Sequence, residues 1–187
     1  GILALVKQYH YTLEEVAGGS RKSAQAEDLQ EKPALLMVLE TIQDPGNLGT
    51  ILRAGEGAGV TGIVMDANTA DIYNPKVIRS TMGSVLRMPF VYVENLHETL
   101  EELKKKKIRL FAAHLQGKHA YDQEDYTGPA AFLIGNEGNG LTEETAAMAD
   151  TYIRIPMEGR VESLNAAVAA SVLMFEAARQ RRNHTGK

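Results

Sequence analysis

Three segments of the sequence combine amide, carboxylate, hydroxyl and guanidinium side chains with glycines, and each follows a short apolar run. The first is residues 41–53, TIQDPGNLGTILR, in which the D-P-G triplet is typical of a turn. We expect Asn47 to cap the helix that follows, with Arg53 six residues further along. A solvent-facing Arg53 is the simpler interpretation. The alternative turns Arg53 inward, toward a strand end, where its rigid fork suits a phosphate group.

The second segment is residues 133–141, LIGNEGNGL, which places Glu137 among three glycines directly after an apolar run. Glycine has no Cβ, so it lets the backbone approach a ligand closely. The order of the glycines is not that of a dinucleotide-binding turn, and no Gly-Lys-Ser/Thr follows as in a phosphate-binding loop. A tight strand-to-helix turn rarely needs three glycines, so we interpret the segment as a ligand-binding loop.

The third segment is residues 153–165, IRIPMEGRVESLN. Pro156 ends the apolar run, Gly159 permits a bend, and Ser163 stands where the N-cap of the last predicted helix is expected. A helix N-terminus with free N–H groups suits polar or anionic groups. For Ser163 alone, capping is the simpler interpretation.

The remaining polar clusters carry weaker signals. The histidines do not stand at metal-ligand spacings, so we predict no metal site; they are His10, His97, His114, His119 and His184. Two basic clusters are typical of solvated helix ends, with phosphate contact as the alternative. These clusters are Lys104–Lys107 with Arg109, and Arg179, Arg181, Arg182 and Lys187 in the tail. The glycines at 55, 57 and 59 favour close helix packing over phosphate binding.

Short apolar runs and helical patterns alternate along the body of the chain and must position these segments. We predict strands at 35–39, 62–65, 90–93, 108–114, 131–134 and 152–155. We predict helices at 48–58, 75–85, 96–106 (capped by Asn95), 143–149 (capped by Thr142) and 164–182. This pattern indicates the α/β class, with a parallel sheet covered on both faces. Ligands bind beyond the carboxyl ends of such strands, so we expect the chemistry in the loops after Leu39, His114, Ile134 and Ile155.

The composition is that of an ordinary globular protein. The 187 residues are 44% hydrophobic and 24% charged, enough for one good core. The absence of cysteine excludes disulfides, thiolate catalysis and iron–sulfur clusters. The formal net charge of −4 argues against gripping nucleic acid by bulk positive charge. No run approaches the roughly 18 apolar residues of a membrane span, so no membrane association is expected.

The first 32 residues differ from the rest. Residues 17–32, AGGSRKSAQAEDLQEK, are polar and rich in small side chains, which predicts a linker, and the body begins at Pro33. The apolar start, residues 1–7, is too short for a signal peptide. It lacks an initiator Met, so we expect a trimmed chain.

Taken together, the three segments resemble the signature motifs of the SpoU (TrmH-like) RNA 2'-O-ribose methyltransferases of the SPOUT superfamily. The pattern N-x-G-x-x-x-R falls on residues 47–53, G-N-E-G-x-G-L on residues 135–141, and I-P-M-x-G-x-x-x-S-L-N on residues 155–165. The motifs stand in the family's order, and the resemblance runs from Leu35 to Arg182. It is strongest to the bacterial large-subunit ribosomal RNA methyltransferases, many of which carry a small RNA-binding domain ahead of the catalytic one.

This resemblance implies a parallel sheet flanked by helices, with a C-terminal segment that threads a deep trefoil knot (the SPOUT fold). Knots are rare exceptions to the usual connection rules. It also implies S-adenosylmethionine as cofactor, ribosomal RNA as substrate, a homodimer that completes the active site, and a cytoplasmic location. It assigns residues 1–32 to the linker or remnant of an N-terminal RNA-binding domain, and residues 33–187 to the catalytic domain.

The resemblance further assigns roles to residues. The positions that match the catalytic set are Asn47, Arg53, Glu137, Ser163 and Asn165. The positions that match the cofactor-binding set are Gly135, Glu137, Gly140, Ile155, Met157, Leu164 and Asn165. A guanidinium stays protonated in proteins, so we expect Arg53 to clamp the phosphate beside the 2'-hydroxyl and lower the pKa of that hydroxyl. Ser163, Glu137 or water would then take the proton. Local basic surface is expected from Arg53, Arg79, Arg87 and Arg160, with Lys104–Arg109 as a further candidate.

Several alternatives stay open. A tRNA 2'-O-ribose methyltransferase shares the same motifs, whereas a base-methylating relative is disfavoured by N-x-G-x-x-x-R and S-L-N. A non-catalytic RNA-binding module that retains the fold predicts the loss of Arg53, Glu137, Ser163 and Asn165, and all four are present. A nicotinamide-dependent oxidoreductase lacks support because no G-x-G-x-x-G turn follows the first predicted strand.

Overall fold

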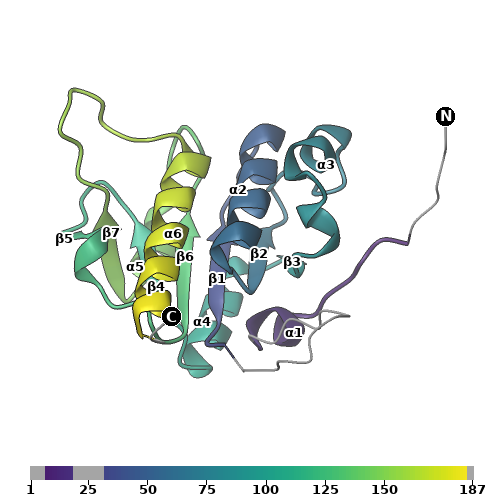
Figure 1. Ribbon diagram of the computed structural model, residues 1–187, viewed down its shortest axis with the longest axis horizontal. Coiled ribbons are helices and arrows are strands. Elements are labelled where there is room, and N and C mark those ends of the chain that lie inside the picture. Colours follow the sequence, from purple (N-terminus) through teal and green to yellow (C-terminus); the bar gives the residue numbers. More distant parts are fainter. Residues whose placement is uncertain (1–6, 19–31, 185–187) are drawn as a thin grey trace.

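Five consecutive apolar residues form the central strand of the protein, β1 (Leu35–Leu39), and every one of their side chains is buried. The first, third and fifth side chains join a hydrophobic cluster on one face of the sheet, and the second and fourth join a cluster on the opposite face. A strand buried on both faces is typical of a parallel sheet covered by helices. The computed structural model, which describes residues 7–18 and 32–184, has this architecture (Figure 1).

The strands form one sheet in the order β3-β2-β1-β6-β4-β7-β5, and each pair of neighbours runs parallel. The other strands are β2 (Gly62–Asp66), β3 (Phe90–Val93), β4 (Arg109–Ala113), β5 (His119–Ala120), β6 (Ala130–Ile134) and β7 (Thr151–Arg154). The predicted α/β class and the six predicted strands are confirmed. The sequence missed β5 because two residues are too short to give an apolar pattern.

Helices cover both faces of the sheet. On one face lie α2 (Pro45–Ala58), α3 (Pro75–Thr81) and α6 (Ala166–His184), which Figure 1 shows side by side. On the other lie α1 (Leu13–Ala17), α4 (Leu96–Lys105) and α5 (Glu143–Ala147). Two short 3-10 turns, Ser84–Leu86 and Tyr121–Gln123, complete the described elements.

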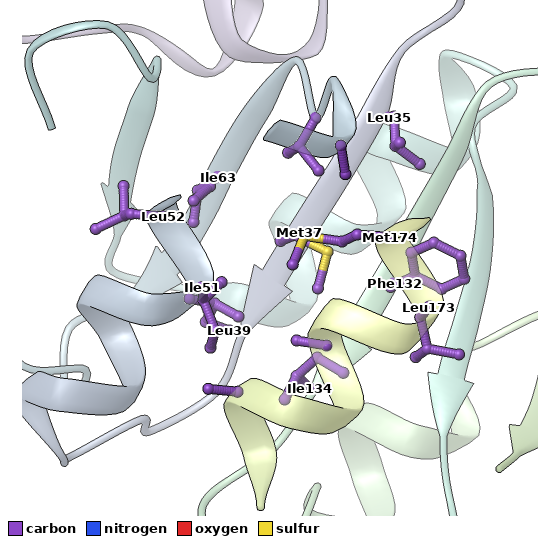
Figure 2. Close-up of a cluster of buried hydrophobic side chains, with 14 of the residues drawn as sticks. Leu35, Met37, Leu39, Ile51, Leu52, Ile63, Phe132, Ile134, Leu173 and Met174 are labelled. Atoms are coloured by element: carbon purple, nitrogen blue, oxygen red, sulfur yellow. The ribbon is translucent and has the colours of Figure 1, made fainter. Parts of the chain in front are cut away.

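The larger cluster joins the sheet to α2 and α6. Figure 2 shows Met37 and Phe132 of the sheet beside Leu173 and Met174 of α6, and Ile51 of α2 belongs to the same cluster. All five side chains are fully buried. At roughly 1.5–3 kcal/mol for each buried side chain of this size, such packing is the main favourable contribution to folding.

Two predicted helix caps are wrong because the capping residue lies elsewhere. Helix α2 begins at Pro45, and the side chain of Asp44 accepts a hydrogen bond from the N–H of Asn47 (2.8 Å), so Asn47 lies inside the first turn. Helix α6 begins at Ala166, and the Asn165 side chain, rather than Ser163, accepts from the N–H groups of its first turn. The Asn and Thr side chains predicted to cap α4 and α5 do so.

The predicted helix 75–85 also ends early. Helix α3 stops at Thr81 because Met82 and Gly83 both take positive φ values, of 50° and 91°. Two successive left-handed residues cannot continue a right-handed helix.

Residues 7–18 lie against the edge of the sheet formed by β2 and β3. Val16 of α1 is fully buried, and a Cβ on Gly62 of β2 would lie 2.6 Å from the Val16 side chain. The ring of Tyr11 packs edge-on against Phe90 at 5.9 Å. Most of the predicted linker, residues 19–31, lies outside the described residues.

Arg181 ties the end of α6 to the loops that lead into β1 and β6. Its guanidinium donates to the backbone oxygens of Pro33 (2.7 Å), Ala34 (3.0 Å), Tyr126 (2.9 Å) and Gly128 (2.7 Å). Burial lowers the pKa of Arg181 to about 10, so the group remains charged at neutral pH. This tail arginine therefore has a structural role and is not free for phosphate contact.

Helices α2 and α3 approach each other at a glycine. A Cβ on Gly49 would lie 1.6 Å from Ser80 Oγ and 3.0 Å from the Val77 carbonyl oxygen. The expected close packing of the later glycines is confirmed at Gly55, where a Cβ would touch Met174 at 3.4 Å. Gly59 instead ends α2 with a φ of 84°.

We predict that Gly49→Ala lowers the free energy of unfolding by about 1–3 kcal/mol, because the methyl group must push α3 away from α2. Guanidinium denaturation followed by circular dichroism measures the change. Gly57→Ala in the same helix is the matched control, since the nearest atom to its Cβ, Phe175 Cζ, is at an ordinary 3.8 Å. The control should raise stability by up to about 1 kcal/mol through helix propensity. Equal effects from both variants would contradict the packing argument.

Candidate functional site

Loops beyond the carboxyl ends of β4, β6 and β7 enclose a cleft of about 750 Å³, a size suited to a small organic ligand. The lining comprises residues 113–116, 134–141, 153–157 and 159–164, together with Ala166, Ala169 and Leu173 of α6. The loops after β4, β6 and β7, where we expect the chemistry, thus come together around this cleft. The loop after β1 does not line the cleft and reaches it only through hydrogen bonds.

The glycine loop after β6 folds back on itself. The backbone groups of Asn136 and Gly140 exchange two hydrogen bonds, of 3.0 and 2.9 Å, and the Asn136 side chain accepts from two further backbone N–H groups of the loop. A Cβ on Gly135 would lie 2.1 Å from the Gly140 carbonyl carbon, and Gly140 has a φ of 71°. Close approach therefore requires glycine at 135, and backbone conformation favours it at 140.

Glu137 extends from this loop to the loop that follows β1. Its carboxylate accepts hydrogen bonds from the backbone N–H groups of Gln43 (3.2 Å) and Asp44 (3.0 Å) and from Asn47 Nδ2 (3.0 Å). The Asn47 position inside α2, rather than at its cap, is what directs its amide to this carboxylate.

A second hydrogen bond connects Asn47 to the third segment. The Asn165 Nδ2 group donates to Asn47 Oδ1 (2.9 Å), while Asn165 Oδ1 caps α6 by accepting from Ala167 N (2.9 Å). One chain of hydrogen bonds, Glu137–Asn47–Asn165, thus joins the first segment to the second and third, through residues 90 and 118 positions away in the sequence.

The hydrogen bonds to Glu137 control its charge. Partial burial by itself would raise the pKa of Glu137, but donors from Asn47, Asp44 and Gln43 outweigh burial and hold the pKa below its ordinary value of 4.5. Glu137 is therefore an ionised acceptor whose oxygens already serve the neighbouring loop.

The predicted residues fall into two groups. Those that line the cleft are Gly135, Glu137, Gly140, Ile155, Met157, Ser163 and Leu164. Asn47 and Asn165 lie outside the lining and join it through the bonds above. Arg53 lies apart, exposed on α2, which agrees with the simpler, solvent-facing interpretation; its side chain makes no hydrogen bond or ion pair within the described residues.

Sequence reasoning missed the side chains after β4. His114, Leu115 and Gln116 line the cleft, yet only the position of their loop was predicted, because their residue types carry no recognisable pattern. Leu115 and Val161 are apolar side chains of the lining that remain 65% and 63% exposed. Apolar groups this exposed at a cleft are suited to contact with a ligand or a partner.

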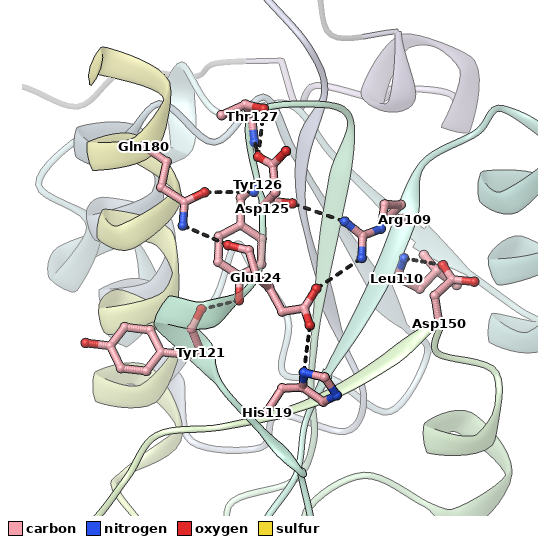
Figure 3. A network of polar contacts seen from close by, with 10 residues as sticks. All are labelled: Arg109, Leu110, His119, Tyr121, Glu124, Asp125, Tyr126, Thr127, Asp150 and Gln180. Atoms are coloured by element: carbon pink, nitrogen blue, oxygen red, sulfur yellow. Dashed lines mark hydrogen bonds and ion pairs between the residues drawn. The ribbon is translucent and has the colours of Figure 1, made fainter. Parts of the chain in front are cut away.

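Part of the expected basic surface is paired with carboxylates. Figure 3 shows Glu124 between Arg109 (3.1 Å) and His119 (3.2 Å). Other ion pairs join Lys106 to Glu14, Arg87 to Glu56 and Arg179 to Glu176. Arg53, Arg79 and Arg160 have no acidic partner among the described residues, so they are the expected cations that remain available.

Over residues 7–18 and 32–184, no helix combines the length and the apolar character that a membrane crossing requires. The same part of the chain contains no group of three or more His, Cys, Asp or Glu side chains arranged to hold a metal ion.

Comparison with known proteins identifies relatives of the chain. The sequence profile of the SpoU rRNA Methylase family matches residues 34–175. A protein of Xylella fastidiosa named 23S rRNA (guanosine-2'-O-)-methyltransferase RlmB is 39% identical over 148 residues, which are 79% of this chain and 59% of that protein. The chain thus spans less than two thirds of the length of this relative.

Solved structures show the same fold. The SpoU methyltransferase AviRb from Streptomyces viridochromogenes, in complex with the cofactor AdoMet, has a TM-score of 0.77 and 33% identity, covering 85% of this chain and 66% of that one. The TrmH/SpoU tRNA modifying enzyme of A. aeolicus has a TM-score of 0.74 and 28% identity, covering 93% of this chain and 82% of that one.

We predict that Glu137→Gln lowers the free energy of unfolding at neutral pH, because an amide nitrogen would face N–H donors. The folded-state pKa of Glu137 is lowered, so its contribution is present above 4.5 and is lost as pH falls through the folded-state pKa. The stability gap between parent and variant should therefore close in acid, as urea denaturation at several pH values would measure. Glu101→Gln, at an exposed position of α4, is the control and should give no such pH-dependent gap. A constant gap for Glu137→Gln would contradict the assignment.

Proposed function

Because the chain belongs to the SpoU rRNA methylase family, we propose that it transfers a methyl group from S-adenosylmethionine to a ribose 2'-hydroxyl of large-subunit ribosomal RNA. The observation that carries the proposal is the hydrogen-bonded chain Glu137–Asn47–Asn165, because it assembles all three motif segments at one edge of the sheet. The 23S rRNA activity in the name of the Xylella relative supports the choice of substrate. With this substrate we also propose a cytoplasmic location.

The cleft fits S-adenosylmethionine in size and chemistry. Ile155, Met157 and Leu164 give it apolar walls, and the loop around Gly135 presents backbone groups where a Cβ has no room. These residues would hold the adenine and methionine parts of the cofactor. When bound, S-adenosylmethionine supplies a methyl group activated by a sulfonium.

Glu137 serves as a positioning residue in this proposal. A carboxylate with a lowered pKa that accepts three hydrogen bonds is a weak base, so it is poorly suited to take the 2'-hydroxyl proton. Its role is to hold Asn47 and the loop after β1 against the glycine loop.

Arg53 and Ser163 are left to act on the RNA. The exposed guanidinium of Arg53 clamps a phosphate next to the reacting ribose, and its charge favours the developing oxyanion at the 2'-oxygen. Ser163 lines the cleft and makes no hydrogen bond among the described residues, so its hydroxyl is available to orient the 2'-hydroxyl. The 2'-oxygen would form its new bond to the methyl carbon as the bond from that carbon to the sulfonium sulfur breaks, the neutral thioether S-adenosylhomocysteine would leave, and the hydroxyl proton would pass to water.

In this proposal Arg53 acts at the cleft of a second copy of the chain, because it does not line the cleft of its own copy. Gly57 lies one helical turn after Arg53, and its Cβ position is 3.8 Å from Phe175 of α6. Phe175 and Val168 of α6 are 49% and 47% exposed. This apolar face beside Arg53 supports a homodimer in which Arg53 of one protomer serves the cleft of its partner.

The proposal includes the knot and the domain boundaries. Strand β7 lies between β4 and β5, whereas the helix that follows it packs across β6 and against α2. The connecting segment, residues 155–165, must therefore cross the ends of β4 and β6, which supports threading through a C-terminal trefoil knot. Residues 33–187 would form the methyltransferase domain, with residues 1–32 linking it to, or remaining from, an N-terminal RNA-binding domain.

Transfer RNA is the alternative substrate. The structural likeness to the A. aeolicus tRNA modifying enzyme supports it, although at 28% identity against 39% for the Xylella relative. The same cleft and the same Arg53 would serve either RNA.

The first test is methyl transfer from labelled S-adenosylmethionine to unmodified ribosomal RNA and transfer RNA, followed by nucleoside digestion. We expect a 2'-O-methylated nucleoside from the ribosomal RNA. Arg53→Ala should lower the rate at least about 100-fold, and Arg53→Lys should lose most of it because a point charge cannot replace the bidentate fork. A base-methylated nucleoside, or full activity of Arg53→Ala, would contradict the mechanism.

The homodimer predicts that Phe175→Glu yields a monomer by light scattering, because a charge cannot be buried at the α6 face. Methyl transfer should fall with dimer content, while S-adenosylmethionine binding in the cleft should persist. Leu86→Glu, at a side chain 53% exposed beyond α3, is the control and should remain dimeric. A parent chain that is itself monomeric and active would overturn the shared site.

A further inference from the structure

A second carboxylate, Glu40, lies beneath the glycine loop and belongs to none of the three motif patterns. It directly follows β1 and is 8% exposed. Its backbone N–H donates to the Ile134 carbonyl oxygen (2.9 Å), which continues the hydrogen bonding between β1 and β6 to the point where the glycine loop begins. A carboxylate this buried requires donors.

The donors come from the start of α5. Glu40 Oε2 accepts from the backbone N–H of Thr142 (2.8 Å), and Glu40 Oε1 accepts from the hydroxyls of Thr142 (2.8 Å) and Thr145 (2.5 Å). Because the Thr145 hydroxyl gives its proton to Glu40, the His97 Nε2 that lies 3.1 Å from it is the donor in that pair.

These bonds fix the far end of the glycine loop. Thr142 follows Leu141, which is buried and lines the cleft, and Leu141 follows Gly140, whose backbone bonds to Asn136 close the loop. The loop therefore enters at Ile134 and leaves at Thr142, and Glu40 holds both points, one through its backbone and one through its carboxylate. Release of Thr142 would free Gly140 from its close contact with Gly135.

We infer that Glu40 is a positioning residue of the proposed methyl-transfer site, one that sets the shape of the cofactor-binding loop without touching the cofactor. The inference rests on the proposed function for the identity of the ligand, S-adenosylmethionine. Its physical basis is independent of that function, because the carboxylate acts on the loop whether or not a ligand is present.

The test compares Glu40→Gln with the parent chain in three measurements. S-adenosylmethionine affinity by calorimetry should weaken about tenfold, because charge-assisted hydrogen bonds to the loop are replaced by neutral ones. KM for S-adenosylmethionine should rise more than kcat falls, since Arg53 and Ser163 are untouched. Hydrogen–deuterium exchange without ligand should quicken in residues 135–145 and stay unchanged in β2 and β3. Glu40→Asp, which keeps the charge, should recover part of the affinity.

Asp150→Asn is the matched control. Asp150 accepts a backbone hydrogen bond from Leu110 (2.7 Å) at the opposite ends of the strands, so its variant should lose stability without losing affinity. If Glu40→Gln fails to fold, Thr145→Val removes one bond to the same carboxylate at nearly constant volume, and it should show the same loop-specific exchange and weaker binding.

Affinity and loop exchange within twofold of the parent would overturn the inference, as would an equal loss of affinity in Asp150→Asn. The proposed function fails separately, if the parent binds no S-adenosylmethionine. In that case faster exchange confined to residues 135–145 would still support the positioning role, and unchanged exchange would overturn it.

Discussion

The site depends on two carboxylates at the ends of two neighbouring parallel strands, each of which accepts hydrogen bonds from the loop that follows the other strand. Glu40, at the end of β1, holds the chain that follows the β6 loop, and Glu137, in the β6 loop, holds the chain that follows β1. Each loop therefore supplies the acceptor that the other loop's backbone N–H groups need. Release of the chain that Glu40 holds would leave a buried carboxylate without its donors, which is costly away from water.

The backbone of Thr41, the residue after Glu40, is strained, and hydrogen bonds to another carboxylate offset that strain. Thr41 has a φ of 56°, a rare conformation for a β-branched residue. Its N–H and hydroxyl both donate at 2.8 Å to Asp66, a carboxylate only 9% exposed at the end of β2. The strained turn directs the Thr41 carbonyl oxygen to the Asn136 side chain (2.9 Å), so it adds another contact between the two loops. Strain of this kind is characteristic of functional sites that the surrounding structure over-determines.

Charge is distributed differently from what the composition suggests. The net charge is −4, and several basic side chains are held within the protein: Arg87, Lys106 and Arg109 pair with carboxylates, and Arg181 donates to backbone oxygens. The arginines without an acidic partner among the described residues are few, and Arg53 lies beside the exposed apolar face of α6. On the proposed function, phosphate recognition would thus be concentrated where two protomers meet rather than spread over one surface.

The sequence by itself determined the α/β class and the loops that line the cleft, because strands buried on both faces leave continuous apolar runs and motif glycines mark close backbone approach. Only the tertiary structure decided which residues act together. Asn47 lies inside a helix and bonds Glu137, although its type suggested a cap. Glu40 gave no local signal, since its donors lie a hundred residues away. The direction of Arg53 was likewise open, because helical periodicity does not say which face the neighbouring helices cover.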